Sequence, residues 1–470
     1  MFSLKKALRE IPLFFLILIL PLSMSGCTTS NNEITPDEAR SIAEEAYVFA
    51  YPMLENYRSM QVQAIRPQTF NRFKHTTKLA GPDDTDIVRE NNDTLYSILW
   101  LDLRTEPVVL TVPPIADRYH SFQLIDLYTH NFGYVGTRAT GTGARTFAIA
   151  GPRWKGEKPT GADDLFRSET NFLLCLVRTG VNIDLPGDYE KVLAIQKQYA
   201  AVPLSAFLGL PAPKAPSMDI FPVFDQKTAD SPGFITYVNF LLGQLEVHPS
   251  EKELIERFGR IGIGPDFYFD ETELSPALRT AIQEGIDSAR KEIQGSGSLL
   301  GKMKNSWLLT ERIFGSREQM QGKYLIRAGA ARMGLYGVDL DEAYYPSSTV
   351  TQDGKPLNAH EKNYVLTFPA GSLPPVRELG FWSITMYNMP DQRMVHNPIN
   401  RYSIGDRTPG LKFDDDGSLK IYLQKDEPGA GAANWLPAPD GPFSVTMRMY
   451  LPQGKALDPL YAPPPVKTYE

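Results

Sequence analysis

The stretch TLYSILWLDLRTEPVVLTVP, from Thr94 to Pro113, decides the fold class. It holds two apolar runs rich in β-branched and aromatic residues, separated by a short polar turn, which is the pattern of two strands. Similar runs follow in YHSFQLIDLY, NFGYVGTR and TFAIAGP, with Gly, Pro and Asp between them. Because no long helical pattern separates these runs, antiparallel pairing is favoured over βαβ units.

A second strand-rich block lies near the C-terminus. Its runs are YVLTFPAG, FWSITMYN, LKIYLQ and FSVTMRMYLP, and Asp416–Gly417 is a hairpin signal before the third run. Helical patterns dominate the residues between the two blocks, for example where Ser275 and Pro276 open a long amphipathic segment. We therefore predict a mainly β chain with helical insertions, in which two antiparallel β-sandwiches flank a helical middle segment.

One further helix is predicted near the N-terminus. Thr35 is suited to the N-cap, Pro36 to the first helical position and Glu38 to a capping box. Pro52 is expected to kink or end this helix. The resulting division is a signal peptide (1–26), a polar tether (27–34), a helix plus sandwich (35–185), a helical connecting region (186–345) and a C-terminal sandwich (346–470).

The composition is that of an ordinary globular protein. The 470 residues are 42% hydrophobic and 22% charged, and the net charge is −7. At roughly 100–200 residues per domain, such a length predicts two or three domains. The interspersed charges give no sign of a nucleic-acid partner, and a homo-oligomer is left open.

The first 27 residues have the layout of a bacterial export signal. Lys5, Lys6 and Arg9 precede the apolar run IPLFFLILILPLSM, which is too short to span a hydrocarbon core of about 30 Å. The following SGC resembles a lipobox, with Cys27 as the acylated residue; an ordinary signal peptide cut nearby is the alternative. Cys27 is followed by Thr28 and not by the Asp that marks retention in the inner membrane in enterobacterial lipoproteins. This resemblance favours the outer membrane. We therefore expect an exported protein anchored by lipid to a membrane surface on the periplasmic side.

Familiar catalytic and metal motifs are absent from the sequence. There is no GxSxG elbow, Walker A sequence or GxGxxG opening a helix, and the six histidines form neither HxH nor HExxH. No cofactor and no metal site is therefore predicted, and Cys175, within NFLLCLV, is expected to be a buried apolar residue.

Four polar clusters stand out beside predicted strands: RENNDTLYS, DRYHSFQLIDLYTHNFGYVGTR, MPDQRMVHNPINRYSIGDR and ANWLPAPDGPF. Each is either a turn bonded to its own backbone or part of a binding site. Alternation places Asp126 on a buried face, where it needs a partner such as Arg118 or Arg138. The candidate ligand-binding residues are Asn92, Asp93, Tyr96, Arg118, Asp126, Arg138, His396, Asn397, Asn400, Arg401 and Trp435.

Two long segments carry a family resemblance. NNDTLYSILWLDLRTEPVVLTVP with RYHSFQLIDLYTHNFGYVGTR resembles the domain-of-unknown-function family numbered 1254. YVLTFPAGSLPPVRELGFWSITMYN, NPINRYSIGD, DGSLKIYLQ and NWLPAPDGPFSVTMRMYLP resemble its usual C-terminal companion, numbered 1214. The resemblance implies two jelly-roll-like β-sandwiches with helical segments between them, often in exported proteins, and implies no particular activity.

Three functional hypotheses follow. The favoured one is an envelope lipoprotein that binds a small oxygenated ligand, a sugar or an aromatic acid, in a polar-aromatic pocket where Asn92, Asp93 and Tyr96 face NPINRY. The alternatives are a hydrolase in which Asp93, Asp126 or His396 acts as acid or base, and a purely structural envelope protein.

The first testable prediction concerns the anchor. Cys27→Ser removes the thiol that would be acylated, so precursor should accumulate in the membrane or the chain should be released. Palmitate labelling of the wild type and the variant measures this, and labelling and processing that are unchanged in the variant would contradict it.

Overall fold

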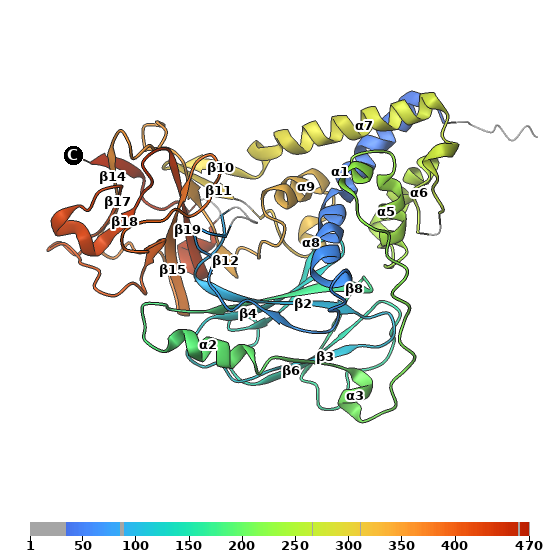
Figure 1. Cartoon of the computed structure of the whole chain (residues 1–470), viewed down its shortest axis with the longest axis horizontal. Coiled ribbons are helices and arrows are strands. Elements are labelled where there is room, and N and C mark those ends of the chain that lie inside the picture. Colours follow the sequence, from blue (N-terminus) through green and yellow to red (C-terminus); the bar gives the residue numbers. More distant parts are fainter. Residues whose placement is uncertain (1–33, 85–88, 266, 311, 459–460, 470) are drawn as a thin grey trace, which may run out of the picture. The chain divides into compact units, whose positions relative to one another are not determined.

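Two β-sandwiches hold the strands of the structure (Figure 1). The structure is a computed structural model, and it describes residues 34–84, 89–265, 267–310, 312–458 and 461–469. The predicted signal peptide and Cys27 lie outside this range. Thr35–Glu470 group into a single unit, so the contacts between the two sandwiches are contacts within that unit.

Nine of the described strands form the N-terminal sandwich. One sheet has the order β1 (Lys74–His75), β2 (Thr94–Asp102), β8 (Phe172–Gly180), β4 (His120–Asp126), β5 (Asn131–Gly136). The facing sheet has the order β7 (Asp164–Arg167), β6 (Arg145–Ala150), β3 (Val108–Val112), β9 (Ala200–Pro203). Alternate side chains of both sheets form one core, with Leu99 and Phe122 from the first sheet and Leu110 and Phe147 from the second.

The C-terminal sandwich has the same construction. Its seven-stranded sheet has the order β10 (Gly301–Lys304), β11 (Trp307–Thr310), β13 (Ser347–Ser348), β19 (Phe443–Pro452), β15 (Val376–Asn388), β16 (Ser403–Gly405), and β12 (Ala343–Tyr344) also pairs with β19. The facing sheet has the order β18 (Trp435–Pro437), β17 (Leu419–Gln424), β14 (Asn363–Phe368), β20 (Val466–Tyr469). Trp382 and Met447 from one sheet pack with Leu366 and Ile421 from the other.

The predicted fold class, mainly β with helical insertions, is confirmed. Among the described strands, none pairs one sandwich with the other. Two pairs are parallel, β6 with β7 and β17 with β18. The connections are residues 151–163 and 425–434, and both are too long for a hairpin. Each returns the chain to the end of the sheet where the first strand began, so the second strand runs parallel to the first.

The N-terminal helix begins where the sequence predicts. Helix α1 (Pro36–Met60) has Thr35 as N-cap, whose Oγ1 accepts the Glu38 N–H at 3.2 Å. The helix does not end at Pro52, and a π-helical turn, Gln61–Ile65, extends it. Pro52 is itself buried, so packing on several sides of α1 holds the helical conformation that proline alone disfavours.

The middle region is less purely helical than expected. Its helices are α2 (Asp188–Gln196), α3 (Leu204–Leu208), α4 (Gln226–Ala229), α5 (Phe234–Leu242), α6 (Lys252–Phe258), α7 (Pro276–Gly295), α8 (Arg317–Met320) and α9 (Tyr324–Met333). The same region also supplies β9 to the first sandwich and β10, β11 and β12 to the second. The overlooked signal is Asn305–Ser306, a two-residue loop with φ of 50° and 70°, as tight hairpins require. Within the described residues, no helix is both long enough and apolar enough to cross a membrane.

Helices α1 and α7 cross closely at Gly285. A Cβ atom placed on Gly285 would lie 2.4 Å from the carbonyl oxygen of Arg40 and 2.9 Å from the Cβ of Ala43. The absence of a side chain is therefore what lets the two backbones approach.

The second prediction tests this crossing. Gly285→Ala should lower the free energy of unfolding by about 1–3 kcal/mol, because overpacking outweighs the better helix propensity of alanine. Gly295→Ala, at the end of the same helix with nothing within 4 Å of the added Cβ, is the matched control and should be neutral or stabilising. Urea unfolding measures both, and equal effects of the two changes would contradict the close crossing.

Candidate functional site

Polar side chains of the C-terminal sandwich are buried on the side that faces away from its core. Along β15 and β19, Trp382, Ile384 and Met447 enter the core, so their neighbours Ser383 and Arg448 point the other way. Ser383 is 4% exposed and Arg448 is 6% exposed. A sheet face of this polarity normally meets water, and here the N-terminal sandwich covers it.

The covering segment is the first polar cluster of the sequence. The Oδ1 atom of Asn91 accepts the Asp93 N–H at 2.6 Å, which is the predicted turn, and Asn91 Nδ2 donates to Thr94 Oγ1 at 2.7 Å. The backbone of the same segment faces the C-terminal sheet, because the Glu90 carbonyl oxygen accepts the Tyr387 hydroxyl at 2.6 Å. Arg89 and Gln392 bond through both backbone and side chain.

Asp93 links the two sandwiches directly. Its Oδ2 atom accepts the Ser383 hydroxyl at 2.7 Å, and its Oδ1 atom lies 3.8 Å from Nη2 of Arg407. The carboxylate is 3% exposed, so both partners act on it away from bulk water. Asp93 therefore has partners outside its own turn, and these partners are not in NPINRY.

Two buried arginines belong to the same region, because each interacts electrostatically with Tyr450, and Arg448 also interacts with Asp93. Arg178 of β8 donates to Gln123 Oε1 at 2.6 Å and to the Tyr336 carbonyl at 2.9 Å, and its guanidinium lies 5.3 Å from the centre of the Tyr96 ring. Arg448 donates to Thr385 Oγ1 at 2.7 Å and to the Tyr387 hydroxyl at 2.8 Å.

Aromatic rings complete the group. The Tyr450 ring stacks on Phe381 with 4.4 Å between centroids, and the Arg407 guanidinium lies 3.3 Å from the centre of the Phe381 ring. Burial, and then the charge of Asp93, hold the pKa of Tyr450 well above its ordinary value, so its phenol is neutral. We call Asp93, Tyr96, Arg178, Ser383, Arg407, Arg448 and Tyr450 the inter-sandwich cluster.

Several buried polar atoms at this contact have no hydrogen-bond partner in the described part of the chain. They are Asn92 Oδ1, Ser444 Oγ, Thr446 Oγ1 and the Tyr450 hydroxyl. Each such group costs roughly 1–3 kcal/mol when left unpaired. These four polar atoms are therefore available to form hydrogen bonds with a further partner.

The predicted residues of the second cluster are held in other ion pairs. Arg118 binds Asp188 through both terminal nitrogens, at 3.1 and 2.8 Å, and also binds Asp117. Arg138 pairs with Glu342 at 2.5 Å and with Asp341 at 3.2 Å. Neither arginine is the partner of Asp126, which was the expectation.

Asp126 instead binds within its own loop. Its Oδ1 atom accepts the His130 N–H at 2.8 Å, and Oδ2 lies 3.3 Å from the imidazole Nδ1. Local backbone geometry brings the i+4 partner closer than either arginine. Burial lowers the pKa of His130 to about 4, with a further contribution from Arg327, so this imidazole is neutral at pH 7.

The third cluster divides into a local turn and two ends that reach the site. Asn397 bonds the Arg401 backbone at 3.0 Å, and Arg401 donates to the Trp435 carbonyl at 2.9 Å. His396 is 2.9 Å from Asp83, and Asn400 is an exposed residue at φ 50°. The ends of the stretch, Gln392 and Arg407, are the parts that contact the first cluster.

Trp435 is buried, but on the side of β18 opposite Leu436, which is the residue that enters the core of the C-terminal sandwich. Trp435 is 3% exposed and donates its indole N–H to the Gln424 carbonyl at 2.8 Å. A ring buried in this way offers no open face to a stacking ligand.

The sequence also contained signals for residues that were not chosen. Arg178 in CLVRTG and Arg448 in TMRMY each interrupt an otherwise apolar strand, and a charge in such a strand must find a partner. Ser383 and Tyr450 carried no comparable signal, because hydroxyl residues are common in strands.

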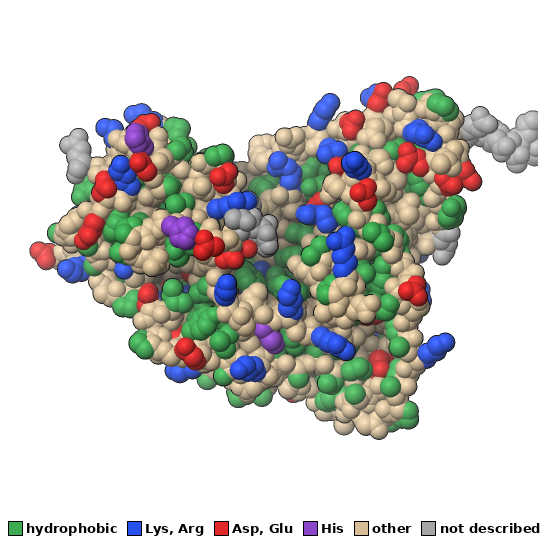
Figure 2. Space-filling model, viewed as in Figure 1, with side chains coloured by type: hydrophobic (Ala, Val, Ile, Leu, Met, Phe, Trp, Pro, Cys, Tyr) green, Lys and Arg blue, Asp and Glu red, His purple; other side chains and the backbone are tan. Residues whose placement is uncertain are grey.

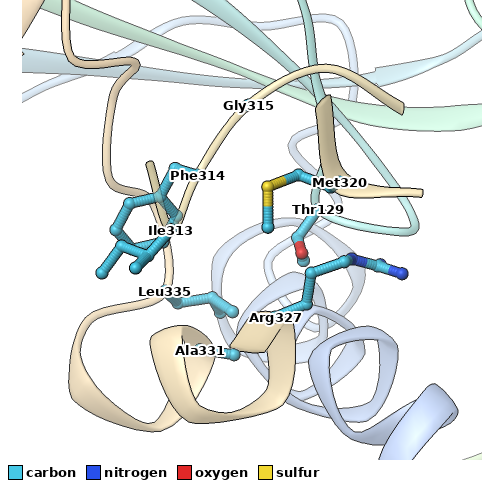
Figure 3. A pocket seen from close by; sticks show the side chains of 8 residues that line it. All are labelled: Thr129, Ile313, Phe314, Gly315, Met320, Arg327, Ala331 and Leu335. Atoms are coloured by element: carbon cyan, nitrogen blue, oxygen red, sulfur yellow. The ribbon is translucent and has the colours of Figure 1, made fainter. Parts of the chain in front are cut away.

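Two cavities lie elsewhere. A surface pocket of about 410 Å³ is lined by residues that include Trp154, Arg167, Glu169 and His248. A cavity of about 10 Å³, beside Arg327 and Thr129 (Figure 3), has room for about one water molecule. In the described ranges, no group of three or more His, Cys, Asp and Glu side chains is arranged to hold a metal ion.

Two family models match parts of the chain. The family described as "Protein of unknown function (DUF1254)" matches residues 70–203, and "Protein of unknown function (DUF1214)" matches residues 342–454. The chain combines a DUF1254 region with a DUF1214 region. The DUF1254 match spans every strand of the N-terminal sandwich, from β1 to β9, and the DUF1214 match contains β15 and β19.

One solved structure shares the fold over most of the chain. The VPA0106 protein from Vibrio parahaemolyticus is 27% identical, with a TM-score of 0.75, covering 92% of this chain and 100% of that one. An uncharacterized protein from Burkholderia cenocepacia is 13% identical, with a TM-score of 0.43, covering 90% of this chain and 88% of that one. Among curated proteins, none matches.

The third prediction concerns acid stability. Burial lowers the pKa of His120 to about 4, as it does for His130. The unfolded state, with a histidine pKa near ~6.5, therefore binds protons first, so the stability present above pH ~6.5 is lost as the pH falls toward 4. Each shift corresponds to a loss on the order of 3 kcal/mol.

Urea unfolding at pH 7 and pH 4.5 measures this dependence. His120→Gln and His130→Gln should each make stability less dependent on pH. His396→Gln is the control, because that side chain is 69% exposed. A pH dependence that neither buried variant reduces would contradict the assignment of neutral, buried imidazoles.

Proposed function

We propose that this protein is an exported envelope lipoprotein that binds a small oxygenated ligand at the inter-sandwich cluster. The observation that carries the proposal is the Tyr450 hydroxyl. Tyr450 is 0% exposed, its phenol is neutral, and among the described residues its hydroxyl has no hydrogen-bond partner. A buried hydroxyl surrounded by charged groups is expected to be paired, and a ligand oxygen would pair it.

The location supports the same proposal. Ligand sites form preferentially where domains meet, and this cluster draws Asp93, Tyr96 and Arg178 from one sandwich and Ser383, Arg407, Arg448 and Tyr450 from the other. Figure 2 shows the surface hollowed between the C-terminal sandwich and the helices, with both basic and acidic side chains beside the hollow. Aromatic rings beside hydrogen-bonding groups are the chemistry that recognises sugars and aromatic acids.

The hydrolytic alternative has less support. Asp93 is engaged by Ser383 and Arg407, Asp126 by His130, and His396 by Asp83. A general acid or base must reach a substrate proton, and each of these groups already has a local partner.

The fourth prediction separates a ligand site from a purely structural contact. Tyr450→Phe removes one oxygen that has no partner in the described protein, so the melting temperature without ligand should stay the same or rise. Ligand stabilisation in a thermal-shift screen of sugars and aromatic acids should fall, with affinity weakened about tenfold.

Tyr268→Phe is the matched control, because Tyr268 is 87% exposed. Asp93→Asn, which preserves the shape and removes the charge, should also change the ligand response. If Tyr450→Phe lowers the melting temperature and leaves the ligand response unchanged, the cluster has a structural role and is not a ligand site.

A further inference from the structure

Two arginines of the inter-sandwich cluster, Arg178 and Arg448, bond only neutral oxygens. Arg178 donates to a glutamine side chain and a backbone carbonyl, and Arg448 donates to hydroxyls and backbone carbonyls. In the part of the chain that the structure describes, neither guanidinium has a carboxylate oxygen within 4.0 Å. They are 5% and 6% exposed, so water does not screen them well.

Other buried arginines of the same chain show what such a group usually contacts. Arg118 is paired with Asp117 and Asp188, Arg138 with Asp341 and Glu342, and Arg317 with Glu169 and Glu251. Arg327 also lacks a close carboxylate, but Asp126 and Glu251 act on its charge. At the inter-sandwich cluster, Asp93 acts on Arg407 and Arg448 together and is already bonded to Ser383.

A buried charge without a close counter-charge is costly, and a chain keeps it where something offsets the cost. We propose that the offset is the ligand itself, and that this ligand is a small carboxylic acid whose carboxylate lies against Arg178 and Arg448. This inference rests on the proposed function, because it names the class of ligand for the same site. The planar guanidinium fork matches a carboxylate better than it matches the hydroxyls of a neutral sugar.

The rest of the cluster sets the shape of the acid. The Arg178 guanidinium lies over the Tyr96 ring, and the Phe381 ring is stacked with Tyr450 and also contacts the Arg407 guanidinium. A ligand with a flat apolar part would contact the rings while its carboxylate contacts a cation. The Tyr450 phenol, neutral and unpaired, donates to the same carboxylate.

The test compares acids with their own amides, which have the same shape and no charge. Benzoate, cinnamate and 2-furoate, each paired with its amide, are titrated into the mature full-length protein by calorimetry. We expect at least one acid to bind at least tenfold more tightly than its amide. Inorganic phosphate is added as a third arm, and we expect it to bind more weakly than the best acid because it lacks the planar part.

Variants assign the binding to the cluster. Arg448→Gln and Arg178→Gln should each weaken the best acid at least tenfold, and Arg448→Lys, which keeps the charge and loses the fork, should have an intermediate effect. Arg66→Gln, an exposed position, is the control and should change nothing. Both buried arginines also make internal hydrogen bonds, so a variant at either position could fail to fold. In that case the comparison of acid and amide binding to the wild-type protein still tests the inference.

The outcomes separate this inference from the proposal on which it rests. If an amide or a neutral sugar binds as well as the acids, in a manner that Tyr450→Phe weakens, the ligand is not an anion and the binding function stands. If phosphate binds as tightly as the best acid, the site selects charge alone and a carboxylic acid is the wrong class. If no acid binds, or if acid binding survives both glutamine variants, the inference is overturned.

Discussion

The structure depends on one constraint, which is that the polar side of the β15–β19 pair must be covered. A sandwich needs a single apolar face for its core, and Trp382 and Met447 provide it. The opposite side of the same strands carries Ser383 and Arg448, and both are buried against the other sandwich. The Asp93–Ser383 bond and the carbonyl oxygens of Arg89 and Glu90 pair part of that side. Each sandwich therefore satisfies polar groups that the other leaves open, and the inter-sandwich cluster exists only when both are folded.

Much of the fold could be predicted because its signals are local. The Thr35 cap, the apolar runs that form β2 and β15, and the Asn91 turn all arise from residues a few positions apart. The chain pairings that were not anticipated are the hairpin at Asn305–Ser306 and the parallel partners of β6 and β17. Pro52 shows the opposite case, in which tertiary packing overrides a strong local preference.

The candidate site was chosen from local polarity, and its long-range partners could not be, for a physical reason. Surplus polarity beside an apolar strand drew attention to Asn92 and Asp93, and both side chains are buried in the structure. The partner of Asp93 lies 290 positions away in Ser383, and no periodicity connects two residues at that separation. Arg401 and Trp435 were equally plausible ligand-binding candidates in the sequence. In the structure, both donate hydrogen bonds to backbone carbonyls of their own sandwich. A polar cluster in a sequence shows that partners are needed, and only the fold shows whether those partners are local.

The most direct measurement of the central claim is a crystal structure of the protein with the carboxylic acid that binds it best. The account predicts ligand density between the sandwiches, with a carboxylate oxygen within about 3 Å of a guanidinium nitrogen of Arg178 or Arg448 and of the Tyr450 hydroxyl. Density confined to the surface pocket beside Trp154 and His248, with ordered water alone bonded to Tyr450, would contradict it.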